Sequence, residues 1–201
     1  MQGAIIIRAQ RNSAIAMIKT ALEHISEELA FRLGLDISEI HVDSLLKLQN
    51  SRDQGLVISL LNVEQESTLK NTPHYIRKNN QLFYKEPPVY LNLLVLLAFE
   101  FGNYGKSLQR LSETVEFFQS QRLFDAENER SENPFPPGLN KMILDLQQIT
   151  MEQLNHIWSI AGGQHFPSLL YKVRLIKIES QDEMKGPEID TIQLDSGLVE
   201  P

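Results

Sequence analysis

The fold is decided by residues 89–101, which read VYLNLLVLLAFEF. Pro87 and Pro88 stop whatever element precedes this stretch. Inside it, only Asn92 and Glu100 interrupt the apolar run. A strand that is apolar on both faces is typical of the centre of a sheet. The run is well short of the roughly 20 residues that a membrane-spanning helix needs, so it predicts a central strand and no membrane crossing.

Other strands are expected on both sides of this central one. The dense Leu, Val and Ile content of residues 55–63 predicts a buried strand, and residues 37–42 predict a short extended piece. Alternating apolar side chains predict a half-buried strand over residues 141–146. A last strand is expected over residues 168–179. Its apolar phase switches between Val173 and Ile176, which predicts a β-bulge.

Three helices are expected between these strands. Apolar residues three or four apart predict a helix over residues 13–33, which Gly34 would end. Asn103 is expected to cap a second helix, and Thr150 with Gln153 forms a capping-box pattern for a third. In the second helix the expected apolar face comprises Tyr104, Leu108, Leu111, Val115 and Phe118. Strands and helices together predict an α+β fold.

Two loops and a tail are candidates for binding partners. Residues 71–81 predict a loop or hairpin tip, in which Arg77 and Lys78 are candidate partner-binding residues. The proline-rich residues 125–138 predict an exposed loop, a second candidate for contacts with other subunits or with a tube.

The C-terminal residues 180–201 are expected to form an extended acidic arm, separate from a single domain over residues 1–179. They hold six acidic residues against one basic residue, most of the net charge of −7. Such a segment lacks the apolar content to fold alone. We hypothesise that it adds as a strand to a neighbouring subunit through Ile189, Ile192 and Leu194; a disordered tail is the alternative.

Composition and motifs favour a structural or binding role over catalysis. The 201-residue chain is acidic and has no cysteine, which argues against nonspecific nucleic-acid binding and excludes thiolate chemistry. No two of its five histidines have the spacing of a zinc motif, and no nucleotide or nucleophile motif is present. Glu64 and Glu66 indicate a solvated strand end, and Trp158 a core residue rather than an interface anchor. No catalytic, cofactor or metal residue is therefore predicted.

Several short segments follow one another in a specific order. They are SLLNVE at 59–64, PPVYLNL at 87–93, the helix from Asn103 that ends in FFQ at 117–119, LNHIW at 154–158 and PSLLYKVR at 167–174. Together they resemble the tail-terminator (cap) family of contractile injection systems, the phage-tail-like particles of the antifeeding-prophage and virulence-cassette type. The resemblance covers roughly residues 13–179.

The resemblance implies a mainly antiparallel sheet flanked by about three helices and a non-enzymatic structural role. It implies a homo-hexameric ring on the distal end of the inner tube and sheath, which stops polymerisation and sets particle length. The partners would be further copies of the chain, the tube protein and the sheath protein, with no cofactor, nucleic acid or membrane insertion. Since no secretory signal is recognisable at the N-terminus, assembly in the bacterial cytoplasm is expected.

Three alternatives stay open at this point. Some relatives carry an additional C-terminal domain, so the chain could be a cap-adaptor paralogue of the same particle. It could also be an unrelated small α+β module that binds a ligand. An enzyme would need a spatial cluster around His156, His165 or Glu64.

Overall fold

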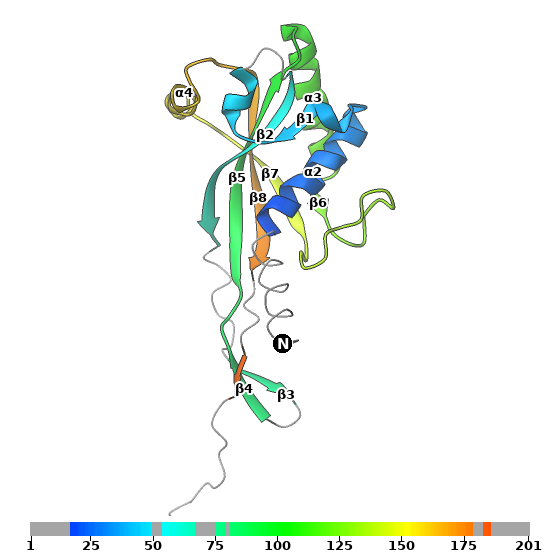
Figure 1. Ribbon diagram of the computed structural model, residues 1–201, viewed down its shortest axis with the longest axis vertical. Coiled ribbons are helices and arrows are strands. Elements are labelled where there is room, and N and C mark those ends of the chain that lie inside the picture. Colours follow the sequence, from blue (N-terminus) through cyan, green and yellow to red (C-terminus); the bar gives the residue numbers. More distant parts are fainter. Residues whose placement is uncertain (1–16, 50–53, 67–74, 79–80, 179–182, 186–201) are drawn as a thin grey trace, which may run out of the picture.

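The computed structural model describes residues 17–49, 54–66, 75–78, 81–178 and 183–185. Within these ranges the main sheet has six strands in the order β1-β2-β5-β8-β7-β6 (Figure 1). Its strands are β1 Ile40–Val42, β2 Gly55–Gln65, β5 Val89–Glu100, β6 Leu123–Phe124, β7 Met142–Gln147 and β8 Ser168–Ile178. All neighbouring strands are antiparallel except β1 and β2, which are parallel. The expected α+β fold with a mainly antiparallel sheet is confirmed.

Strand β5 lies inside the sheet and is buried on both faces, as its sequence predicts. One face, with Leu97 and Phe99, packs under α2 (Met17–Leu33) and α3 (Tyr104–Ser120). The opposite face, with Leu96 and Ala98, packs under α4 (Met151–Ile160) and the short 3-10 helix η2 (Leu45–Gln49). Two layers of helices therefore enclose the upper half of the sheet.

The bulge expected in the last strand is present in β8. Leu91 and Leu93 of β5 pair with Ile176 and Val173 of β8, so two residues of β8 oppose one of β5. The extra residue turns Ile176 into the same core as Val173, and both are almost completely buried. The bulge therefore keeps one face of a long strand apolar across the change of phase.

A small second sheet continues the molecule beyond the lower end of β5 (Figure 1). It consists of β3 (Tyr75–Lys78), β4 (Gln81–Lys85) and β9 (Glu183–Lys185), in the order β3-β4-β9 among the described residues. Lys78 pairs with Gln81, which confirms a hairpin within the predicted 71–81 segment. Part of the predicted C-terminal arm, Glu183–Lys185, thus pairs with β4 of its own chain.

The predicted buried face of α3 is wrong in part. Tyr104 is 70% exposed and Leu108 is 40% exposed, whereas Ser107 and Thr114 are buried. Both buried hydroxyls donate to helix carbonyls: Ser107 to that of Asn103 at 3.2 Å and Thr114 to that of Arg110 at 2.8 Å. Small polar residues can face the core because these bonds satisfy them. The apolar stripe is therefore shifted by about one residue.

The predicted helix ends are confirmed where the structure describes them. Asn103 Oδ1 accepts a hydrogen bond from Lys106 N, and Thr150 with Gln153 forms a reciprocal capping box. Helix α2 is described from Met17, so residues 13–16 of the predicted first helix lie outside the described residues. None of the helices in the described part of the chain combines the length and the apolar character that crossing a membrane requires.

Candidate interaction surfaces

A row of paired charges crosses the lower half of the sheet on the face that carries α4. Lys172 of β8 donates to Glu64 of β2 at 2.8 Å, bridging over β5. Their side chains are 26% and 41% exposed, so the pair is partly desolvated. Glu64 is thus still solvated, as predicted for a strand end, and in addition it pairs with a base two strands away.

The row continues toward the opposite edge of the sheet. Asn92 of β5 donates to Glu66 at 2.9 Å, and the Glu66 side chain is only 11% exposed. Arg174 lies between Glu66 and Asp145, at 4.0 and 3.5 Å. Asp145 also pairs with Arg122. We call Glu64, Glu66, Asn92, Asp145, Arg122, Lys172 and Arg174 the polar row.

The composition of the polar row suits contact with another protein rather than acid–base chemistry. Each of its carboxylates already faces a cation or an amide donor, so it lacks the two differently tuned groups that general acid–base catalysis needs. A pair of this exposure contributes little to stability while free, but it orients charge for a partner. Lys172 and Arg174 are two residues apart, so they share one face of β8. Glu64 and Glu66 have the same spacing and the opposite charge, a match that sequence analysis could have used to predict their pairing.

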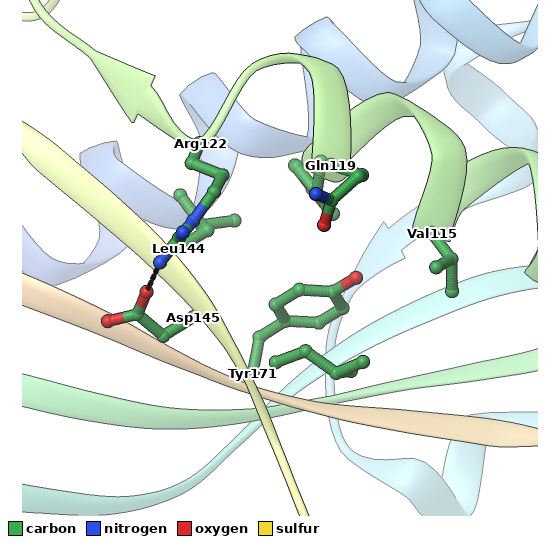
Figure 2. Close-up of a pocket in the computed structure, with 8 residues that line it drawn as sticks. Val115, Gln119, Arg122, Leu144, Asp145 and Tyr171 are labelled. Carbon is green, nitrogen blue, oxygen red and sulfur yellow. Dashed lines mark hydrogen bonds and ion pairs between the residues drawn. The ribbon is translucent and has the colours of Figure 1, made fainter.

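A cavity of 210 Å³ lies between the C-terminal half of α3 and strand β7 (Figure 2). Val115 and Gln119 line it from α3, and Tyr171 lies at its base with its hydroxyl directed toward α3. Burial raises the pKa of Tyr171 to about 12, so the hydroxyl stays protonated and can donate. The Arg122–Asp145 pair closes one side. The cavity combines apolar walls with a few polar groups, as sites for a partner's side chain do.

A wider cavity of 410 Å³ lies between α4 and the same sheet. Leu61, Ile157 and Leu170 form apolar parts of its wall, and the Glu64–Lys172 pair and His156 border it. The enzyme alternative required a cluster of this kind, but neighbouring Glu64 is already paired with Lys172. No group of three or more His, Asp or Glu side chains in the described ranges could hold a metal ion.

Trp158 is the one residue of α4 that is buried, and Leu154 and Ile157 pack beside it against the same cluster. Trp158 is 3% exposed and packs with Phe166, which confirms its prediction as a core residue. At the two ends of the helix, Met151 and Ile160 are 80% and 86% exposed. They lie nine residues apart, half a turn round the helix from each other, so they do not form one patch; Ile160, opposite Trp158, is the one that faces away from the sheet.

The proline-rich loop after β6 is fastened to α2, so its prediction as a simply exposed loop is wrong in part. Asn133 and Phe135 are buried. Asn133 Nδ2 donates to Glu28 at 2.8 Å, and Arg130 Nε donates to the two oxygens of Glu28 at 2.9 and 3.1 Å. The tips of the loop at Glu127 and Glu132 remain exposed. The loop therefore projects with a defined conformation that its buried contacts hold, which its proline content alone did not predict.

His24 completes the fastening of this loop. Its Nδ1 lies 3.1 Å from Asn133 Oδ1, and its ring packs edge-on against Phe135. Burial lowers the pKa of His24, and this outweighs the raising effect of the Glu28 and Glu27 carboxylates and the Asn133 hydrogen bond; Arg130 also lowers it. The imidazole is therefore held neutral.

Of the five residues predicted to bind partners, the structure describes the backbone of two. Arg77 and Lys78 lie in β3, at the lower end of the molecule (Figure 1). Ile189, Ile192 and Leu194 lie outside the described residues. The structure adds the polar row, the α3–β7 cavity and α4, which arise from contacts between residues far apart in the chain.

Comparison with solved structures finds the same fold in two terminator proteins. A PVC sheath/tube terminator of an extracellular contractile injection system, in its extended state, superposes with a TM-score of 0.62 at 15% identity, covering 90% of this chain. The anti-feeding prophage cap, a tube-terminating cap, superposes with a TM-score of 0.60 at 12% identity, covering 87% of this chain. The chain spans 65% and 59% of the lengths of these two proteins.

Two comparisons of the sequence were made, and one of them identifies a family. A search of curated protein sequences found no match. The family model of the Pvc16 N-terminal domain, by contrast, matches residues 16–191, most of the chain. The chain belongs to the Pvc16 N-terminal domain family.

Proposed function

We propose that this protein is a structural terminator of a contractile injection system. Six copies form a ring on the distal end of the inner tube and sheath, stop their polymerisation and set the particle length. The protein acts without a cofactor and without catalysis, and it assembles in the bacterial cytoplasm as part of a phage-tail-like particle. It neither binds nucleic acid nor inserts into membranes.

The observation that carries this proposal is the shared fold with two proteins described as a sheath/tube terminator and a tube-terminating cap. The likeness covers 90% and 87% of this chain, and the family match spans the same region. The surfaces described above add physical support, because they are built for contact rather than for chemistry. The polar row is paired throughout, and α4 exposes large apolar side chains.

The placement of two projecting elements suits a closed ring. Such a ring needs a head-to-tail interface made of two different patches on each copy. Helix α4 and the loop between β6 and β7 project on opposite sides of the main sheet (Figure 1). The buried hydrogen bond from Asn133 to Glu28 and the buried side chain of Phe135 fasten the loop, so it can present its exposed residues without a large ordering cost. We assign α4 and this loop to the two sides of the ring interface.

The hairpin of β3 and β4 is our candidate for contact with the tube. It projects from the lower end of the molecule, away from α4 and α3 (Figure 1). Arg77 and Lys78 lie on this hairpin, and a sixfold ring repeats the pair six times. Repetition makes weak contacts sufficient through avidity.

The proposal is tested with purified protein and purified tubes. Mass photometry of the full chain is expected to show a species of six copies, and negative-stain microscopy is expected to show it at tube ends. The double variant Arg77→Glu, Lys78→Glu should still form the ring but no longer bind the tube ends. The control variant Lys19→Glu, on the exposed side of α2, should form the ring and bind the tube ends. If the protein stays monomeric in the presence of tubes and is not found bound to tube ends, the proposal is wrong.

A further inference from the structure

The outer edge of β7 is open beside the α3–β7 cavity. On this edge β6 pairs only with Met142 and Ile143, and the Leu144 amide donates to the Arg122 carbonyl at 2.9 Å. Backbone groups alternate along a strand, so the amide and carbonyl of Leu146 point the same way as those of Leu144. No strand among the described residues pairs there. The Leu146 carbonyl accepts a hydrogen bond from Gln147 Nε2 at 3.4 Å, so the Leu146 amide is the main-chain partner that this edge offers to an added strand.

The cavity lies where such a strand would place a side chain. Leu146 is 53% exposed and lines the cavity together with Val115 and Tyr171. A cavity of about 150 Å³ with apolar walls can already hold a benzene-sized group. The 210 Å³ here therefore leaves room for one aliphatic side chain. An open edge beside a pocket is the arrangement by which proteins bind extended segments.

We infer that the groove between α3 and β7 binds the C-terminal segment, residues 186–201, of a second copy of this chain. The inference rests on the proposed ring, because the ring supplies the second copy. Sixteen residues follow Lys185, enough to extend roughly 50 Å. Exchange of this segment from each copy to the next is itself head-to-tail, and it would close around a ring.

The chemistry of the segment fits the groove. Ile192 and Leu194 are two residues apart, so in a strand they share one face and can point toward the cavity. Between Gly186 and Pro201 there is no Lys or Arg, and Glu188 and Asp190 are acidic. The Arg122 side chain at the side of the cavity is 58% exposed and can meet such a carboxylate.

The absence of cysteine from the chain makes disulfide trapping a clean test. One preparation of the full chain carries Leu146→Cys, and a second carries Ile189→Cys, Ile192→Cys or Leu194→Cys. After mixing and mild oxidation, we expect a disulfide-linked heterodimer for at least one of the three. Tyr104→Cys, 70% exposed on α3 and outside the proposed ring interface, is the control acceptor and should give none. An excess of a synthetic peptide of residues 186–201 should suppress the heterodimer.

Main-chain pairing is tested separately with two variants of one residue. Leu146→Pro removes the outward amide without touching the pairing of β7 with β8, and Leu146→Ala removes only the side chain. We expect the concentration needed for ring assembly to rise about tenfold more for the proline variant, the effect of one lost main-chain bond near 1.4 kcal/mol. Equal effects of the two variants would contradict strand addition.

The outcomes separate this inference from the proposed function. Rings that form without any heterodimer overturn the groove and leave the terminator proposal standing. A disulfide found only within single chains of a doubly substituted protein overturns the second copy as the occupant. Absence of both rings and tube binding counts against the proposed function itself.

Discussion

Glu28 and Asn133 stand 105 positions apart, yet Asn133 Nδ2 donates to Glu28 Oε1 at 2.8 Å. The bond joins the middle of α2 to the loop after β6. Both side chains are buried, at 3% and 5% exposure, so neither can exchange its partner for water. The contact converts a proline-rich connection into a projection of defined shape.

Removing this contact should destabilise the protein. We expect Asn133→Ala to lower the free energy of unfolding by about 2 kcal/mol, because it leaves the His24 ring and the Glu28 carboxylate short of a partner. Urea unfolding followed by circular dichroism measures the change. The matched variant Asn155→Ala, on the exposed side of α4, should stay within about 0.5 kcal/mol of wild type. Equal effects of the two variants would show that the loop is not fastened as described.

The buried His24 predicts a pH dependence of stability. Its pKa is lowered by burial from the ordinary value of 6.5, so below that pH the unfolded chain takes up a proton that the folded chain refuses. Wild type should therefore lose stability relative to His24→Gln as the pH falls below 6.5, and the two should run parallel above it. Unfolding midpoints in urea between pH 5 and 8 test this. A difference that grows in favour of wild type toward acid would show a raised pKa instead.

Two glycines with positive φ should differ sharply in their tolerance of alanine. A Cβ at Gly55, with φ of +147°, would lie against the backbone carbonyl oxygen of Glu39, whereas a Cβ at Gly34, with φ of +60°, meets nothing within 4 Å. We expect Gly34→Ala to cost about 1 kcal/mol from backbone strain alone. Gly55→Ala should cost about 2 kcal/mol more, because backbone must move. Thermal unfolding of both variants measures the loss of stability. A similar loss for the two variants would contradict the close approach of Gly55 to the Glu39 carbonyl.

Exposed residues of α4 should affect assembly and not folding. Ile160 is 86% exposed, so Ile160→Asp should change the free energy of unfolding by less than about 0.5 kcal/mol. If α4 forms one side of the ring interface, the same variant should lose the ring species in mass photometry. Tyr104→Asp, 70% exposed on α3, is the matched control and should retain it. A ring that survives Ile160→Asp would remove α4 from the interface.

The fold was predictable from the sequence wherever local signals decide the structure. The apolar stretch of β5, the caps at Asn103 and Thr150 and the bulge before Ile176 depend on residues close together in the chain. Each of these was confirmed. The face of α3 was not predicted fully, because buried Ser107 and Thr114 satisfy their hydroxyls within the helix, which a hydrophobic pattern does not register.

The interaction surfaces were largely unpredictable for a different reason. Lys172 reaches Glu64 only because the sheet places β8 and β2 on either side of β5. Asn133 contacts Glu28 only because the loop folds back on α2. Such pairs depend on strand order, which no local pattern supplies. Two signs were visible in the sequence: the matching two-residue spacings of Lys172 with Arg174 and of Glu64 with Glu66, and Asn92 in the central strand, a buried amide that finds its partner in Glu66.

As a terminator, this protein is proposed to end the growth of a tube and its sheath. The most direct test of this claim is the length distribution of particles, measured by electron microscopy, from a producing strain with the gene deleted and then restored. We predict tubes of uncontrolled length, or no complete particles, in the deletion strain and a single sharp length after restoration. Particles of normal and uniform length in the deletion strain would contradict the claim.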